Sequence, residues 1–375
     1  MIRRSSFRFR AAAFLLVFFA AGFLLQASRE GDARLYLLAA AVPGGILFLL
    51  LLPARFFPLD RPSLSAALAL CGLGILAPAA IRPDLALEQG IRCAASLFLL
   101  AAGAVLVRSC HPSFPAGVFS AFLGFMMLAF PFFAPESPVS LSEGGFILLF
   151  VSVSVFLSMR LRLPALIISL GGMALLLFSG KLDSAAACGL VSILMFWAVS
   201  GSGLWSLIAL ILNAGCFAGY LCFSSQPAES AAASVSARLS ACPLILPEAG
   251  EAADPASPES LFLLLGEQYG LIILLCAVLL LMLILLRGAS LALHTRKAFH
   301  SSLALQAILL LGLRALFYLL SLSGLVPFSS GQFPFLSDAL PDLLAQFFLL
   351  GILSGVSARN EADLEEDTRL SMLAR

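Results

Sequence analysis

The sequence predicts an all-α polytopic integral membrane protein. Hydrophobic residues make up 61% of its 375 residues and charged residues only 11%, and the mean hydropathy is +1.04. A soluble domain holds about 45–50% apolar and about 25% charged residues, so the composition excludes that class. The net charge of +1 gives no reason to expect nucleic acid as a partner.

The apolar residues fall into runs separated by polar segments, most of them close to the ~20 residues that cross a bilayer. In order, the runs are Ala11–Ala27, Leu35–Leu52, Ser63–Ile81, Ile91–Val107, Phe114–Phe133, Gly144–Met159, Pro164–Ser179, Ser184–Ser200, Leu204–Phe223, Leu261–Leu286, Ser301–Leu322 and Pro341–Val356. The first run follows several arginines, as in a signal peptide. It lacks a small-residue cleavage site and further spans follow it, so we expect a retained helix.

Basic residues gather in alternate loops, which orients the chain. The loops that we assign to the cytoplasm contain Arg55, Arg61, Arg108, Arg160, Arg162, Arg287, Arg296 and Lys297, and Arg359 lies in the tail. The positive-inside rule therefore predicts that both termini are cytoplasmic. The large polar segment Ser224–Ser260, which is acidic and rich in Ala, Pro and Ser, is then extracytoplasmic.

The stretch 184–223 and the cysteines leave alternatives open. Gly201-Ser202-Gly203 divides the stretch, so it forms either a hairpin of two membrane helices, which we favour, or part of the outer loop. The eight cysteines lie mostly in apolar runs without CxxC spacing, which argues against zinc or redox chemistry. Cys222 and Cys242 flank the outer segment and either pair or stay as free thiols.

The run Leu261–Leu286 contains Gly266-Glu267-Gln268-Tyr269-Gly270 one to two turns inside its start. A carboxylate at that depth is costly unless it faces protein or water, so Glu267 is a functional candidate. The alternative is a side chain near the interface that reaches water. Just upstream, Ser257 is expected to cap the helix, with Pro258 at its first position and Glu259 in its first turn.

Arg314 lies near the middle of the next run, where a lone cation costs at least ~2.5 kcal/mol. We expect it to pair with an acid, with Glu267 as one candidate, or to bind a phosphate. After this run, the stretch Pro327–Ser337 repeats proline and glycine and cannot form a regular helix. It is either part of a site or a rigid connector.

These C-terminal motifs resemble the SEDS family, the RodA/FtsW/SpoVE-like polymerases of cell-wall glycan. The first motif, Gly266-Glu267-Gln268-Tyr269-Gly270, resembles the family's Gly-Glu-Glu-Phe-Gly, with Tyr269 in place of Phe. The second motif, which includes the stretch Pro327–Ser337, resembles the family's Gly-Leu-Leu-Pro-x-Thr-Gly-x-x-x-Pro-Phe-x-Ser loop. The matching positions of the second motif are Gly324, Leu325, Pro327, Pro334, Phe335 and Ser337. The resemblance covers roughly the last hundred residues, and upstream it is mostly one of topology.

Two upstream stretches resemble the family loosely. Ser142-Glu143-Gly144-Gly145 stands where the family has Pro-Asp-Leu-Gly-Thr, and Leu87–Arg92 stands where it has Gln-Pro-Ser-Glu-x-x-Lys. Glu88 and Arg92 are one helical turn apart and can pair.

The resemblance implies a SEDS-like bundle of ten core transmembrane helices, or twelve with the extra hairpin at 184–223. It divides the chain into a seven-helix region over 1–180, a large extracytoplasmic loop over 181–260, a three-helix region over 261–357 and a cytoplasmic charged tail over 358–375. It places the protein in the bacterial cytoplasmic (inner) membrane.

The implied activity is polymerisation of peptidoglycan glycan strands from lipid II, in elongation, division or sporulation, with a class B penicillin-binding protein as transpeptidase partner. The family's catalytic Asp lies seven residues before the first motif, which here is Glu259. The candidate substrate-binding residues are Glu267, Pro334, Ser337 and Arg92, together with Arg314, which is a candidate because it is a cation inside an apolar run. No metal site or cofactor is expected, although a divalent cation at the pyrophosphate is compatible with the chemistry.

The sequence departs from the family in ways that keep other functions open. Glu259 replaces the catalytic Asp, Arg314 replaces a Gln, and Ala339-Leu340 replace a Gly-Gly pair. The main alternative is a catalytically degenerate scaffold or lipid-handling protein of the cell-wall machinery. A glycan polymerase or ligase of the O-antigen type is a third, which Arg/His pairs in the outer loop would favour.

Overall fold

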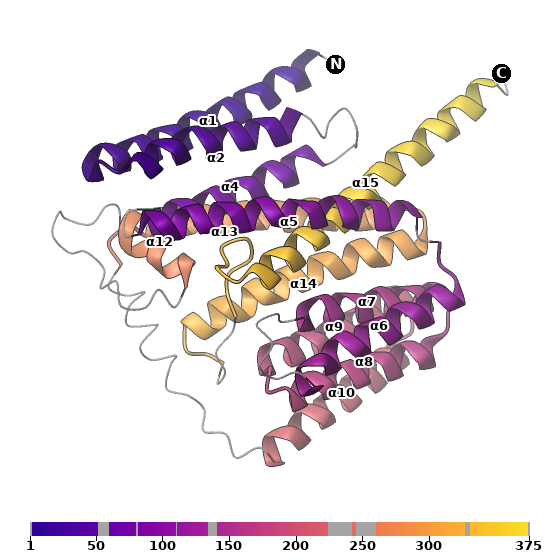
Figure 1. Ribbon diagram of the computed structural model, residues 1–375. Coiled ribbons are helices and arrows are strands. Elements are labelled where there is room, and N and C mark those ends of the chain that lie inside the picture. The colour runs from indigo at the N-terminus through magenta and orange to yellow at the C-terminus, as the bar shows by residue number, and fades with distance from the viewer. Residues whose placement is uncertain are drawn as a thin grey trace. The chain divides into compact units, whose positions relative to one another are not determined.

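A computed structural model describes residues 2–51, 60–79, 82–109, 111–133, 141–223, 242–244, 260–326 and 331–373. Every regular element in these ranges is an α-helix, which confirms the predicted all-α class (Figure 1). The chain forms two compact units, each assembled from separate stretches of sequence. Unit 1 comprises Met1–Phe98, Ser236–Arg287 and Gln332–Leu343, and unit 2 comprises Leu99–Val235, Gly288–Gly331 and Leu344–Arg375.

Among the described residues, unit 1 contains four whole helices and parts of three others. The whole helices are α1 (Ile2–Glu30), α2 (Ala33–Leu51), α4 (Arg61–Ala79) and α12 (Leu261–Tyr269). The parts are the start of α5 (Pro83–Ser109), most of α13 (Leu271–His294) and the first residues of α15 (Leu340–Leu373). The helix α4 is buried over most of its length and packs against α1, α2 and α12. A helix that is apolar all round belongs in the centre of a bundle, and α4 takes that place in unit 1.

Unit 2 is built mainly from consecutive helices that pack on one another. They are α6 (Phe114–Phe133), α7 (Ser142–Ser158), α8 (Arg162–Phe178), α9 (Leu182–Ser200) and α10 (Gly203–Phe223), joined by α14 (Ala298–Leu322) and most of α15 (Leu340–Leu373). The helix α14 packs against both α7 and α9. The charged stretch from residue 358, expected to be a tail, continues α15 as helix to Leu373.

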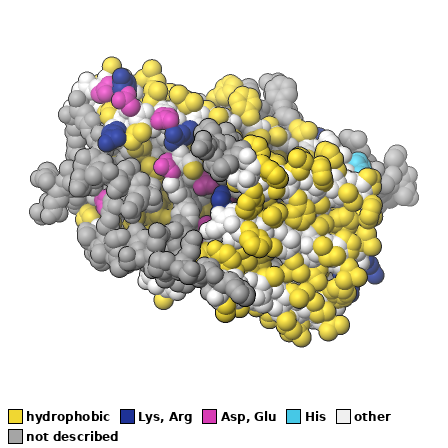
Figure 2. Space-filling view, turned by 60° about the horizontal axis from the view of Figure 1, so that its bottom comes forward, with side chains coloured by type: hydrophobic (Ala, Val, Ile, Leu, Met, Phe, Trp, Pro, Cys, Tyr) yellow, Lys and Arg dark blue, Asp and Glu magenta, His cyan; other side chains and the backbone are white. Residues whose placement is uncertain are grey.

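The helices have the lengths and surfaces of membrane spans. Among the described residues, nine helices are long and apolar enough to cross a membrane, and three shorter apolar helices cover the other predicted runs. Large side chains such as Phe98 and Phe119 are exposed, and Figure 2 shows a broad face covered by hydrophobic side chains. Apolar surface on this scale needs a lipid environment. The chain is therefore a multi-pass membrane protein.

The stretch 184–223 forms the favoured helical hairpin, α9 and α10. The turn between them contains Gly201 with a φ of +62°, a left-handed conformation that glycine adopts without steric cost. Asn213 of α10 is buried and donates a hydrogen bond of 3.2 Å to Ser192 Oγ of α9. Polar contacts of this kind hold helices together in lipid. Cys222 at the end of α10 is exposed, and its pairing with Cys242 stays one of two alternatives.

The run Leu261–Leu286 differs from the single helix that hydropathy predicted. It breaks at Gly270, whose φ of +87° separates α12 from α13. The start of the helix also differs, because the N-cap is Ser260, whose Oγ accepts from the Leu263 N–H at 3.3 Å, and not Ser257. An N-cap serine accepts a hydrogen bond from the backbone N–H of the third helical residue, so it must directly precede the first turn. Tertiary packing decides at which residue that turn begins.

In unit 2 the helices α15 and α5 cross closely at Gly351, and a substitution there tests the crossing. A Cβ added at Gly351 of α15 would lie 2.3 Å from the Leu100 carbonyl oxygen of α5, and backbone cannot rotate away as a side chain can. We expect Gly351→Ala to destabilise the protein by about 1–3 kcal/mol. Thermal unfolding of the purified protein in detergent should show a lower midpoint. Gly215→Ala is the control, since nothing lies within 4 Å of a Cβ there, and equal midpoints for both variants would contradict this crossing.

Candidate functional site

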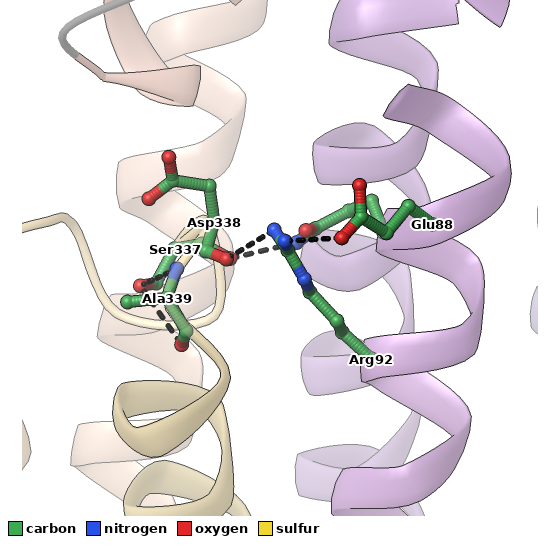
Figure 3. A network of polar contacts seen from close by, with 6 residues as sticks. Glu88, Arg92, Ser337, Asp338 and Ala339 are labelled. Atoms are coloured by element: carbon green, nitrogen blue, oxygen red, sulfur yellow. Dashed lines mark hydrogen bonds and ion pairs between the residues drawn. The ribbon is translucent and has the colours of Figure 1, made fainter. Parts of the chain in front are cut away.

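In unit 1 the start of α5 forms hydrogen bonds to the loop that precedes α15, which the structure describes over residues 331–339 (Figure 3). Gln89 Nε2 donates to the Ser337 carbonyl oxygen at 2.7 Å, and Arg92 donates to the next carbonyl oxygen, that of Asp338, at 2.5 Å. Arg92 also forms the predicted ion pair with Glu88, at 2.6 Å. Gln89 is almost fully buried, so its amide needs a protein partner. The two donors fix two successive peptide groups of the loop.

The loop is also bonded within itself. The Asp338 N–H donates to Gln332 Oε1 at 2.7 Å, and Gln332 Nε2 donates back to Asp338 Oδ1. Ser337 Oγ accepts from the Ala339 N–H at 3.1 Å, at the start of α15. Phe335 is buried and has a φ of +64°, a conformation that costs a bulky residue free energy. Over residues 331–339 the loop thus has one defined, irregular conformation, as its proline and glycine content predicted.

The broken helix α12 lies against this loop. The ring of Phe262 stacks on Phe333 with 4.7 Å between centroids and 30° between planes. Gly266 permits the break, because a Cβ there would lie 2.6 Å from Leu274 Cδ1 of α13. Glu267 is half-buried on the last turn of α12, and the Tyr269 hydroxyl donates to the Leu76 carbonyl oxygen of α4 at 3.5 Å. The first motif therefore ends one helix and starts another.

Four of the six predicted site residues belong to this part of unit 1. Arg92 and Glu267 are half-buried, whereas Pro334 and Ser337 are buried and Ser337 is wholly inaccessible. Glu259, the predicted catalytic residue, lies outside the described residues. The helix α12 begins after it in the sequence, at Leu261 with Ser260 as the N-cap.

Arg314 belongs to unit 2 and has an acidic partner there. It forms an ion pair with Glu143 on the first turn of α7, with the two side chains 17% and 11% exposed. Its guanidinium carbon also lies 6.0 Å from the centroid of the Phe146 ring. The predicted pairing of Arg314 with an acid is confirmed, but the acid is Glu143 and not the suggested Glu267. Next to it, Lys181 donates to Ser142 Oγ.

Three residues of the site were missed by sequence reasoning. Gln89, Gln332 and Asp338 hold the loop, and each is joined to it by side-chain hydrogen bonds. Polar residues at helix starts and in loops are ordinarily solvated, so their positions in the sequence offered no reason to single these three out. The burial of Gln89, which only the structure shows, distinguishes it from a solvated residue. Among the residues that the structure describes, no group of three or more His, Cys, Asp or Glu could hold a metal ion.

Comparison with known proteins agrees with this geometry. Residues 257–362, from the segment before α12 into α15, match the family model of FtsW, RodA and SpoVE, described as cell cycle protein. The chain also has the fold of a protein solved in a study of how a peptidoglycan synthase complex coordinates polymerization and crosslinking. That likeness has a TM-score of 0.60 at 16% sequence identity, over 80% of this chain and 98% of the other.

Residues 257–362 of the chain are thus similar to the SEDS family. Both motifs on which the resemblance was recognised lie inside the matched range, which spans α12 to α15. The likeness in fold covers 80% of this chain and so extends beyond the range of the family model. No curated protein matches the chain.

Proposed function

We propose that this protein polymerises peptidoglycan glycan strands from lipid II at the outer face of the bacterial cytoplasmic membrane. The observation that carries the proposal is the meeting of three separate motifs in unit 1. The start of α5 holds the loop before α15, and Phe262 of α12 stacks on Phe333 of the same loop. The predicted topology, with both termini cytoplasmic, places the starts of all three helices on the outer side.

The proposed reaction is a glycosyl transfer. The acceptor hydroxyl oxygen forms a bond to the anomeric carbon of the donor sugar, and the bond from that carbon to the pyrophosphate oxygen breaks. The bonding electron pair leaves with the polyprenyl pyrophosphate, and the hydroxyl proton passes to a carboxylate base. We assign the base to Glu259. Cations near the departing pyrophosphate would stabilise its developing charge.

The other candidates bind the substrate or shape its site in this proposal. Glu267 is half-buried beside the helix break, and Pro334 and Ser337 shape the loop from inside. Arg92 and Arg314 are each neutralised by an acid, Glu88 and Glu143 respectively. An anionic substrate group could therefore bind either arginine only by displacing its acidic partner. We expect activity without a cofactor, and comparing EDTA with added Mg²⁺ tests for a divalent cation at the pyrophosphate.

The proposed partner is a class B penicillin-binding protein, which would cross-link the new strand. The solved chain with the same fold belongs to a peptidoglycan synthase complex in which polymerization and crosslinking are coordinated. A role in elongation, division or sporulation would follow from which transpeptidase binds. Co-purification of the full chain with each class B protein of the same cell tests this assignment.

The proposed topology makes a prediction for the segment Ser224–Ser260. With the native cysteines replaced, a cysteine introduced at Ser236 should react with an impermeant thiol reagent in intact cells. The physical reason is the excess of Arg and Lys in the alternate loops, which retains those loops in the cytoplasm. Labelling that appears only after lysis would invert the topology and remove the proposed outer site.

The decisive experiment is polymerisation of labelled lipid II by the purified protein, alone and with its transpeptidase. Glycan strands resolved by length would support the polymerase. Full binding of lipid II without polymerisation would favour the second candidate, a degenerate scaffold or lipid-handling protein. The observation that favours this second function is that Glu replaces the family's Asp while both candidate arginines are already paired.

A further inference from the structure

Asp338 is held at three atoms while part of its carboxylate remains uncommitted. Its N–H donates to Gln332 Oε1 at 2.7 Å, its carbonyl oxygen accepts from Arg92 at 2.5 Å, and its Oδ1 accepts from Gln332 Nε2. Oδ2 has no hydrogen-bond partner among the described residues, and the residue is only half-buried. In Figure 3 the carboxylate points away from the contact between Arg92 and Glu88.

The backbone around Asp338 is fixed by more side-chain hydrogen bonds than are needed to connect two helices. Gln89 places a buried amide against the preceding carbonyl, at 2.7 Å. Three residues before Asp338, Phe335 keeps a left-handed backbone, and such conformations persist only where the surrounding structure over-determines them. Positions of this kind cluster at ligand-binding sites. The loop therefore orients Asp338 independently of any ligand.

The local charges decide which ligand such a carboxylate would accept. Glu88, Asp338 and Asp342 are acidic, and Arg92, the cation that donates to the described part of this loop, is already paired with Glu88. An anionic pyrophosphate would be repelled by this balance. An ionised carboxylate accepts hydrogen bonds only, so its partner must be a neutral or cationic donor. Sugar hydroxyls are neutral donors.

We propose that Asp338 binds a hydroxyl group of the glycan and that Gln89, Arg92 and Gln332 are positioning residues that hold it. This rests on the proposed function, because it takes the lipid-linked disaccharide as the substrate. It also assigns Arg92 a role that differs from a direct contact with the pyrophosphate. The guanidinium acts through the Asp338 carbonyl oxygen.

The test measures binding of lipid II to the full-length protein in nanodiscs, together with kcat and KM of polymerisation. Asp338→Asn keeps an Oδ1 acceptor for Gln332 and replaces Oδ2 with a donor. We expect Kd and KM to rise about tenfold, the loss of one charged hydrogen bond, with kcat within about twofold. Gln89→Met, which removes the amide donor without burying a charge, should give a smaller rise in KM.

Two controls separate a glycan contact from a general disturbance. Asp84→Asn removes another α5 carboxylate, which is exposed and paired with Arg34, and should leave Kd and KM unchanged. Polyprenyl pyrophosphate without sugar should bind the wild type and Asp338→Asn equally. This comparison remains valid if the variant has a lower melting temperature, because a disturbed fold would weaken both ligands.

The possible outcomes are distinct. Wild-type Kd and KM in Asp338→Asn, in an active protein, would overturn the assignment and leave the proposed function standing. Equal weakening of lipid II and the sugar-free lipid would also overturn it, as would a fall in kcat at constant KM. Failure of the wild type to bind lipid II would overturn both proposals. Selective weakening of lipid II supports the glycan contact, even if the wild type does not polymerise.

Discussion

Replacing Glu259 with Gln is expected to abolish lipid II polymerisation by the purified protein. The amide keeps the size of the side chain but cannot accept the proton of the attacking hydroxyl. A positioned general base contributes about 10²–10⁴-fold to rate, so the residual activity should fall below one per cent. The measurement is the initial rate of strand formation from labelled lipid II, with the amount of folded protein matched by size-exclusion chromatography.

Two further variants make this result specific to Glu259. Asp254→Asn removes a nearby outer-loop acid and should have little effect. Glu259→Asp restores the family's residue and should keep or raise the rate, since the intrinsic pKa values of the two acids are similar, about 4.3 and 3.9. Folding should be nearly unaffected by Glu259→Gln, by less than ~1 kcal/mol. Robust polymerisation by the Gln variant would remove Glu259 from the mechanism.

Breaking the ion pair between Arg314 and Glu143 should have the largest effect on stability. Glu143→Ala leaves the guanidinium without its carboxylate inside unit 2, where both side chains are mostly shielded. Removing one partner of a buried pair costs about 3–5 kcal/mol, because the other charge remains buried. We expect little folded protein on size-exclusion chromatography of the solubilised membrane fraction.

Neutral replacements should recover the loss. Arg314→Gln, the residue of the family, should be tolerated better than Arg314→Leu, because the amide can still donate to Glu143. The double variant Glu143→Gln with Arg314→Gln should fold better than Glu143→Ala alone, since it buries no unpaired charge. Equal yields for Arg314→Gln and Arg314→Leu would indicate that Arg314 reaches water and needs no partner.

The sequence by itself determined the features that depend on local composition and spacing. The apolar runs became helical, with one of them divided into two helices, because lipid requires that backbone groups bond within their own segment. The pair Glu88 and Arg92 formed as predicted, because four residues along a helix bring two side chains together wherever the helix lies. The Gly-Glu-Gln-Tyr-Gly motif and the proline loop likewise carried the resemblance to the SEDS family without coordinates.

Tertiary structure decided the features that depend on long-range partners. Hydropathy could not predict the break at Gly270, because a glycine adopts positive or negative φ according to what packs around it. It predicted that Arg314 needs an acid but not that Glu143 of α7 would provide it. The hydrogen bonds from Gln89 and Arg92 to the loop connect residues more than two hundred positions apart in the sequence. Such contacts leave no periodicity in the sequence, since only packing brings their two sides together.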